Sequence, residues 1–223
     1  MTIAVIGGTG KEGRGLVLRL ATQASEEVII IGSRQREKAR AVAAELNLLA
    51  KHATIIGQEN RDAARQADVI ILTVPYSAHE RTIREIAEEM AGKILVDATV
   101  PLDPTNPCRL KRRSELSAAE EAQALLGDTV KVVAAFQNVS ARALRALDEP
   151  VQCDVLVCGD DAEAKGRVMR LITRMGFRAL DAGPLEMARL VEALTPLLIS
   201  LNLRYRSKTT GIRITGLDHR HDP

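Results

Sequence analysis

The sequence predicts an α/β fold, a doubly wound and mostly parallel sheet with helices on both faces and a small helical part at the C-terminus. Short apolar runs alternate with helical patterns from the first residues onward, which is typical of parallel strands joined by helices. Several of these runs do not alternate polar and apolar residues, as expected of strands covered on both faces. The 223 residues suit one large domain and a small appendage. We expect the sheet domain in residues 1–182 and the helical segment in 183–223.

The individual elements follow from the spacing of the apolar residues. The expected strands are residues 2–6, 28–31, 53–57, 67–74, 93–98, 130–136, 153–158 and 177–180. The expected helices lie after the first glycines, at 37–49, 60–65 and 76–90, from a capping box at Ser117 and Glu120 through Leu126, up to Met175, and over 187–201. Two prolines predict that 103–116 is irregular, and 153–180 is expected to extend the alternating pattern by one more unit.

Glycines follow the first strand at the spacing used for dinucleotide phosphates. Gly8, Gly10 and Gly13 fit G-x-G-x-x-G between the strand 2–6 and a helix, and a second strand follows at the distance of a βαβ unit. One glycine makes the tight turn, one lets the backbone approach a pyrophosphate, and one lets helix and strand pack closely. The helix N-terminus then points free N–H groups at the phosphates. The pattern favours a Rossmann-like nucleotide site over a turn that binds nothing.

The end of the second strand predicts which dinucleotide binds. An NAD site usually has Asp or Glu there to hold the ribose 2′-hydroxyl. Here Ser33 and Arg34 occupy that place, with Arg36 and Lys38 close behind. A hydroxyl and a guanidinium suit a 2′-phosphate, because arginine matches phosphate geometry with paired donors. We therefore expect NADP(H), the alternative being a solvated, cationic helix start.

Ligands of such sheets bind beyond the carboxyl ends of the strands. That rule places the glycine turn, Ser33–Arg34, Val74–Pro75–Tyr76, Thr99–Leu102 and the residues from Gln137 to Ser140 at one edge. Tyr76 there is either a cofactor contact or an amphipathic surface residue. Four cations in 109–113 are either part of a binding loop or a solvated charge run.

Composition excludes several classes of function. The net charge of +2 and an aromatic content of 2% argue against nucleic-acid binding. No run reaches the ~18 apolar residues of a membrane span. Three cysteines lack metal-ligand spacing, so we expect no metal site and a reducing, cytoplasmic setting. None of the four histidines, His79 included, lies in a recognisable catalytic pattern, which suits hydride transfer between cofactors that carry the chemistry themselves.

Several short segments together resemble one family, the coenzyme F420-dependent NADP oxidoreductases, from Thr2 to about Leu217. They are Gly7-Gly-Thr-Gly with Gly13, Gly32-Ser-Arg34, Thr73-Val-Pro-Tyr76, Ala135-Phe-Gln-Asn-Val-Ser-Ala141, Cys158-Gly-Asp-Asp161, Asp181-Ala-Gly-Pro184 and Val191-Glu-Ala-Leu-Thr-Pro196. The resemblance implies direct, reversible hydride transfer between NADP(H) and the deazaflavin coenzyme F420, with no catalytic residue of the chain. Separately, the apolar helix face at 187–201 is a candidate contact for an expected homodimer, although core packing explains it equally well.

The resemblance also implies site residues. The pyrophosphate would be surrounded by Thr9, Gly10, Lys11 and Glu12, together with Gly8 and Gly13. The 2′-phosphate would be held by Ser33, Arg34 and Lys38. The nicotinamide side would be lined by Val74, Pro75, Tyr76, Glu80, Leu102 and Ala141. The deazaflavin would lie against Gln137, Asn138, Val139 and the C-terminal helices, reaching Thr210. Its anionic tail would meet the cations of 109–113, a hypothesis motivated by charge alone.

One position departs from the family. Relatives often have His where this chain has Gln137, and Gln forms hydrogen bonds but carries no proton. Two alternatives therefore stay open: an NADPH-dependent reductase of a flavin or of a small imine or carbonyl substrate, and a non-catalytic NADP(H)-sensing module.

Overall fold

A computed structural model describes residues 1–23, 28–50, 53–147 and 151–217. Its main sheet has eight strands in the order β10-β9-β8-β5-β4-β1-β2-β3. These strands are β1 Thr2–Ile6, β2 Val28–Ser33, β3 Thr54–Glu59, β4 Val69–Leu72, β5 Ile94–Asp97, β8 Lys131–Ala134, β9 Asp154–Gly159 and β10 Arg178–Asp181. The neighbouring strands β3, β2, β1, β4, β5 and β8 are all parallel, as the sequence predicts.

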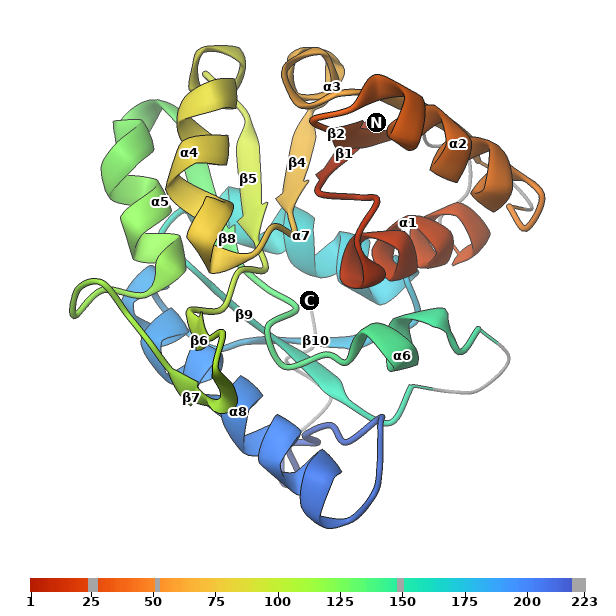
Figure 1. The fold of residues 1–223 in the computed structure, drawn as a ribbon. Helices are drawn as coiled ribbons and strands as arrows, with labels where there is room; N and C mark the ends of the chain where they lie inside the picture. The colour runs from red at the N-terminus through yellow and green to blue at the C-terminus, as the bar shows by residue number, and fades with distance from the viewer. Residues whose placement is uncertain (24–27, 51–52, 148–150, 218–223) are drawn as a thin grey trace.

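Helices cover both faces of the sheet. They are α1 Lys11–Gln23, α2 Arg36–Asn47, α3 Asn60–Gln66, α4 Tyr76–Ile86, α5 Ala118–Leu126, α6 Ala141–Arg145, α7 Ala162–Arg174 and α8 Ala188–Arg204, with short 3₁₀ turns at η1 Ala87–Glu89, η2 Gly127–Thr129 and η3 Leu185–Met187. Residues of α1, α2, α6 and α7 pack into one core, and residues of α3, α4, α5 and α8 into the other. The two groups of helices lie on opposite sides of the strands (Figure 1), so the predicted doubly wound fold is confirmed.

Successive side chains of a strand feed the two cores in turn. In β1, Ile3 and Val5 belong to the core under α1, whereas Ala4 and Ile6 belong to the core under α3, and all four are fully buried. This alternation across the sheet explains why the strand reads as a continuous apolar run.

The sheet changes direction after β8, where the sequence predicts one more unit of the same kind. Strand β9 pairs antiparallel with β8, and β10 then pairs parallel with β9. Between β8 and β9 the chain forms the short helix α6, which packs against α1. The expected strand–helix–strand unit is therefore present as β9, α7 and β10, but it runs opposite to β8, and the end of β9 pairs with the carboxyl end of β8, where Cys158 lies opposite Ala134.

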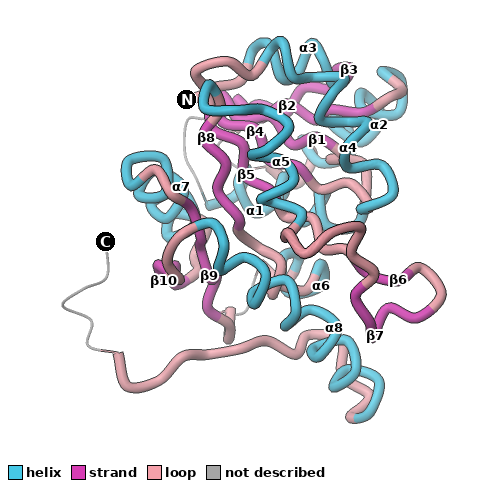
Figure 2. The backbone as a smooth tube through the Cα atoms, turned by 90° about the vertical axis from the view of Figure 1, so that its left-hand side faces the viewer, coloured by secondary structure: helices cyan, strands magenta, loops and turns pink. Residues whose placement is uncertain are grey.

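Residues 103–116 are more regular than the sequence predicts. Leu102–Asp103 (β6) and Asn106–Leu110 (β7) form an antiparallel hairpin, which packs against α8 and stands to one side of the main sheet (Figure 2). Asp103 makes the turn, because its Oδ1 accepts hydrogen bonds from the backbone N–H and hydroxyl of Thr105. The prolines do exclude a helix here, but a two-stranded ribbon tolerates Pro107 on its open edge.

The segment after α8 returns to the sheet. The Asp154 backbone N–H donates to the Ile212 carbonyl at 2.8 Å, and the Ile214 N–H donates to Asp154 Oδ2 at 2.7 Å. Figure 2 shows this segment running from the end of α8 past the start of β9. Among the described residues, every helix is too short or too polar to span a bilayer.

Candidate active site at the carboxyl edge of the sheet

The glycine turn is shaped by close contacts that leave no room for side chains. A Cβ added at Gly8 would lie 2.7 Å from the Val5 carbonyl oxygen, and one at Gly13 would lie 2.6 Å from the Gly8 Cα. A Cβ at Gly10 would meet only the Gly7 carbonyl oxygen, at 3.3 Å, so the outer side of the turn is open. The turn therefore has the form of a phosphate cradle, with the N-terminus of α1 directly behind it.

One hollow of about 590 Å³ brings together many of the predicted coenzyme residues. Its lining includes Thr9, Gly10, Ser33, Arg34, Lys38, Val74 and Pro75, drawn from the carboxyl ends of β1, β2 and β4. Ser33 is mostly buried and Arg34 is exposed. The hollow thus holds a glycine turn at one end and a hydroxyl with two cations at the other, which are the donors that a dinucleotide carrying a 2′-phosphate needs.

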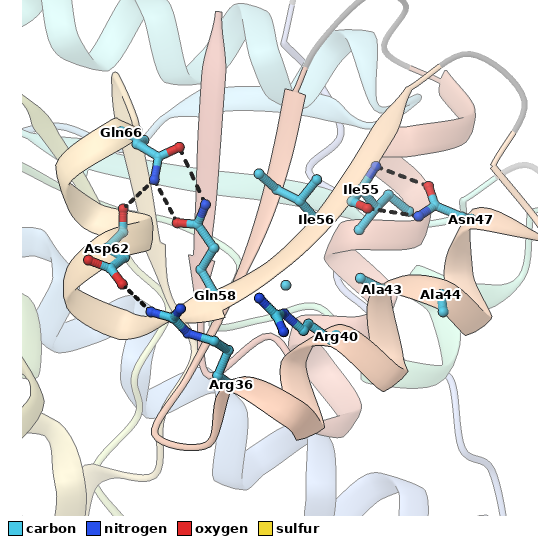
Figure 3. A pocket seen from close by; sticks show the side chains of 11 residues that line it. Arg36, Arg40, Ala43, Ala44, Asn47, Ile55, Ile56, Gln58, Asp62 and Gln66 are labelled. Carbon is cyan, nitrogen blue, oxygen red and sulfur yellow. Dashed lines mark hydrogen bonds and ion pairs between the residues drawn. The ribbon is translucent and has the colours of Figure 1, made fainter.

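Arg36 belongs to a different hollow. Figure 3 shows it between α2, β3 and α3, where its Nη2 lies 2.6 Å from Asp62 Oδ2. In the same hollow Gln58 and Gln66 bond each other, and Asn47 bonds both the N–H and the carbonyl of Ile55. These pairs satisfy polar side chains along the edge strand β3. Arg36 is bound to Asp62 here and does not line the hollow that contains Ser33, Arg34 and Lys38.

Lys11 and Glu12, which the resemblance places around the pyrophosphate, occupy the first turn of α1, directly after the glycine turn. Lys11 is exposed and Glu12 is partly buried. Burial of the Glu12 carboxyl raises its pKa to about 8, and the charge of Asp97 adds to the effect. A carboxyl that stays protonated at neutral pH does not repel a nearby pyrophosphate.

A second hollow, of about 560 Å³, lies between the start of α4 and the β6–β7 hairpin. Its lining includes Pro75, Tyr76, Leu102, Lys111, Arg112 and Arg113. The Tyr76 hydroxyl lies 3.0 Å from the Glu121 carboxylate and accepts a bond from the Arg113 N–H, while the Arg113 guanidinium covers the ring at 4.8 Å. Glu80 pairs with Arg113 at 3.3 Å on the outer side. Tyr76 is therefore held in place by Glu121 and Arg113 rather than left as an unattached surface residue.

A buried His–Asp pair, which the sequence reasoning missed, lies at the end of β5. His79 Nε2 is 2.6 Å from Asp97 Oδ2, and both side chains are fully buried. Burial alone would lower the pKa of His79, but the charge and hydrogen bond of Asp97 outweigh it and raise the pKa. Asp97 Oδ1 also accepts from the Thr99 N–H at 2.9 Å. The signal in the sequence was a charged residue inside the apolar run 93–98, which requires a buried partner.

The three predicted acceptor residues at the end of β8 have different surroundings. Gln137 Nε2 donates to the Asp97 carbonyl at 2.8 Å, and the Gln137 carbonyl accepts from Thr195 Oγ1 of α8 at 2.7 Å. The Asn138 amide is directed at β9 and donates to the Asp154 carbonyl at 2.7 Å. Val139 is buried in the core under α1.

Two other predicted residues lie farther along the edge. Ala141 is the first residue of α6, and Leu144 of the same helix packs against Gly15 of α1. Thr210 belongs to the returning C-terminal segment, where its hydroxyl donates to Asn202 Oδ1 at 2.6 Å. It is not among the residues that line either of the two hollows described above.

Glu192 of α8 is a further buried acid that the sequence reasoning did not single out. Its Oε1 accepts from the Ala118 N–H at the start of α5, at 2.8 Å, and its side chain is fully buried. Burial and the charge of Asp97 raise the pKa of Glu192 to about 8. In the described ranges, no group of three His, Cys, Asp or Glu residues could hold a metal ion.

Comparison with known proteins decides the family. A family model described as NADP oxidoreductase coenzyme F420-dependent matches residues 2–101. The F420-dependent NADP reductase of Methanocaldococcus jannaschii is 49% identical, over 98% of this chain and 100% of that protein. This chain belongs to the F420-dependent NADP reductase family. The family resemblance predicted from the sequence is therefore confirmed.

Two further members of the comparison agree with this assignment. The F420-dependent NADP reductase of Methanothermobacter thermautotrophicus is 46% identical over 97% of this chain and 96% of that one. The solved structure of an Arthrobacter sp. FB24 protein, assigned as an F420-dependent NADP-reductase, matches with a TM-score of 0.82 and 27% identity over 97% of this chain and 100% of that chain. The fold is thus shared over nearly the whole length of both chains.

Proposed function

We propose that this protein catalyses reversible hydride transfer between NADP(H) and the deazaflavin coenzyme F420. The observation that carries the proposal is the order of groups along the carboxyl edge of the sheet. Ser33 and Arg34 at the end of β2 are followed by the glycine turn at β1, the Val74–Pro75 corner after β4 and the buried amide of Gln137 after β8. Four strand spacings separate β2 from β8. At ~4.8 Å each, they span about 19 Å, enough for an extended dinucleotide with a second ring beside it.

The residues present fit both coenzymes. Gly10 leaves the turn open to a pyrophosphate, and Ser33, Arg34 and Lys38 supply donors for a 2′-phosphate. Beyond β5, Gln137 has a buried polar atom without a partner, which suits a polar ring edge. When bound, the two coenzymes supply the hydride donor and acceptor carbons themselves, so the chain has to hold and orient two planar rings and exclude water.

The cations of the hairpin support a place for the anionic tail of F420, but only two of the four are available. Arg112 donates to the Arg189 carbonyl at 2.6 Å, and Arg113 is bound to Glu80 and Tyr76. Arg109 and Lys111 are exposed, and Lys111 lines the hollow beside Tyr76. Replacing Arg109 and Lys111 by Ala should weaken F420 binding, more so for a form with a long glutamate tail. Unchanged affinity for both forms would discard this placement.

We also propose a homodimer and a C-terminal part that completes the acceptor site. Leu190, Leu197 and Leu203 are exposed apolar residues on α8, which suits contact with a second copy. The same helix reaches Gln137 through Thr195, which supports the role expected for residues after 182. Cys108, Cys153 and Cys158 are free thiols, which suits a reducing, cytoplasmic setting.

One assay separates the proposed reaction from its alternatives. NADPH is mixed with oxidised F420, with free flavin, with a cyclic imine and with no acceptor, and absorbance is followed. Rapid loss of the oxidised deazaflavin absorbance with F420 alone is the expected result. Faster turnover of flavin or imine would replace the proposal with a different reductase. Tight NADPH binding without turnover of any acceptor would favour a sensing module.

A further inference from the structure

Several buried polar atoms without a hydrogen-bond partner belong to residues around Asp97. They are His79 Nδ1, Thr99 Oγ1, Gln137 Oε1 and Glu192 Oε2. Buried polar groups in folded proteins are almost always paired, so such a cluster requires a reason. His79 belongs to α4 and Glu192 to α8, while Thr99 and Gln137 follow the carboxyl ends of β5 and β8, where the second ring is proposed to lie.

The chemical identity of the free Gln137 atom is fixed by its neighbours. The Asp97 carbonyl only accepts hydrogen bonds, so the amide nitrogen of Gln137 has to face it, at 2.8 Å. The same carbonyl also accepts from the Ala135 N–H at 3.2 Å. Reversing the amide would bring two acceptors together. Oε1 is therefore the free atom, and Gln137, which is 4% exposed, presents an acceptor.

The backbone holds this acceptor rigidly. Phe136 has φ = 76°, a left-handed conformation that is strained for a bulky residue, and it is buried against Phe177. The Val139 N–H closes the turn on the Phe136 carbonyl at 3.0 Å, and Thr195 of α8 binds the Gln137 carbonyl. Strain of this kind persists only where the surroundings impose it, and it often marks a binding site.

We propose that Gln137 Oε1 accepts a hydrogen bond from an N–H next to a carbonyl on a planar ring bound at the ends of β5 and β8, and so selects rings that carry such a donor. This inference rests on the proposed function. Two groups share this chemistry, the imide N3–H of the deazaflavin and the carboxamide NH₂ of nicotinamide. A ring with only acceptors at that edge would place two acceptors face to face and bind more weakly.

Binding measurements with paired ligands test the proposal. Dissociation constants are measured for a deazaflavin and its N3-methyl derivative, and for NADP⁺ and its 3-acetylpyridine analogue, which lacks the carboxamide NH₂. The wild-type protein should bind the member with the N–H about tenfold more tightly in one of the two pairs, as expected for one buried hydrogen bond. The pair that shows the preference identifies the source of the donor.

Variants of Gln137 test whether the affinity ratio depends on its Oε1 atom. Gln137→Met should abolish the tenfold ratio, and Gln137→His should restore part of it, since one ring nitrogen can face Asp97 while the other accepts. Gln123→Met is the matched control, because both amide atoms of Gln123 bond backbone groups at the far end of β8. It should lower stability and leave the ratio unchanged.

Two outcomes of the binding measurements would contradict the role of Gln137. Equal affinities within both pairs for the wild-type protein would overturn the proposal without any variant, as would a ratio that survives in Gln137→Met. A protein that binds neither deazaflavin would instead contradict the proposed function, and the nicotinamide pair would still decide the role of Gln137.

Discussion

Arg34 and Arg36 stand two residues apart at the end of β2 and have different surroundings. Arg34 lines the hollow that contains the glycine turn, whereas Arg36 is bound to Asp62 across the hollow of Figure 3. The sequence presents both as cations beside a 2′-phosphate. The two arginines have different partners because helix α3 places Asp62 within reach of Arg36 and not of the hollow that Arg34 lines.

Replacing Arg34 by Ala should therefore weaken NADP⁺ binding about tenfold to a hundredfold and leave NAD⁺ binding nearly unchanged. A charge-assisted hydrogen bond contributes ~1.5–3 kcal/mol, and NAD⁺ has no 2′-phosphate to receive it. Titration of both coenzymes by calorimetry measures the two constants. Arg36→Ala is the matched control and should keep the ratio between them. An equal loss in the two variants would contradict the assignment.

Glu192 should make stability depend on pH. Its pKa is raised in the folded protein to about 8, so the folded state holds the proton more tightly than the unfolded state. The stabilisation is fully present below the unfolded pKa, near 4.5, and is lost as pH rises through about 8. Glu192→Gln mimics the protonated acid and should remove this loss, which we expect to be on the order of 2 kcal/mol.

Thermal unfolding at pH 5 and pH 8 checks this prediction. The wild-type protein should lose about 4–8 °C more than Glu192→Gln between the two values. Glu12 contributes a change of the same sign in both proteins, so only the difference between them reports on Glu192. Glu186→Gln, which changes an exposed carboxyl close by, should behave like the wild type. A wild-type protein that is more stable at pH 8 than Glu192→Gln would refute the assignment.

At the scale of elements, one buried arginine holds α6 beside α1. Arg19 is 2% exposed and donates to the carbonyls of Ala143, Leu144 and Ala146, while its guanidinium lies 5.0 Å from the centre of the Phe177 ring. A five-residue helix has several carbonyls without internal partners, and Arg19 satisfies them. Because α6 follows the turn that carries Gln137, this contact also supports the acceptor end of the site.

Arg19→Met should cost about 3 kcal/mol of unfolding free energy, since it leaves buried carbonyls unpaired. Arg14→Met, on the same helix, removes a pair with Glu45 that is largely exposed, and should cost no more than ~0.5 kcal/mol. Urea unfolding of both variants measures the difference. Similar losses in the two would show that α6 is held by its apolar contacts alone.

At the scale of the molecule, two cores on the faces of the sheet are joined to a separate C-terminal arm. Helix α8 turns Val191 and Leu198 inward and leaves Leu190, Leu197 and Leu203 exposed. The same helix touches the hairpin and the turn of Gln137, so a partner that covered α8 would also stabilise the acceptor end of the site.

If α8 forms the dimer contact, Leu197→Glu should convert a dimer to a monomer in sedimentation velocity, because burying a carboxylate in an apolar contact is costly. Leu48→Glu is the control, since Leu48 is 86% exposed at the end of α2, on a different part of the chain. It should sediment like the wild type. A monomeric wild-type protein, or a dimeric Leu197→Glu, would remove α8 as the interface.

The sequence by itself determined the alternating elements, the glycine turn and the grouping of Ser33, Arg34 and Lys38 beside that turn. These depend on local patterns: buried strands are continuous apolar runs, and the cradle and its cations lie within residues 8–38. In the segment 103–116, which was predicted to be irregular, the part up to Leu110 forms a hairpin instead, because a hairpin depends on pairing between segments, which the prolines did not prevent.

Tertiary structure alone decided the surroundings of Gln137 and of Asp97. The reversal of β9, the pairing of His79 with Asp97 and the contact of Thr195 with Gln137 join residues 18 to 58 positions apart. No local pattern specifies such partners, because burial and hydrogen bonding between distant segments select them. The same reason separates Arg34 from Arg36, and leaves Gln137 with one free acceptor.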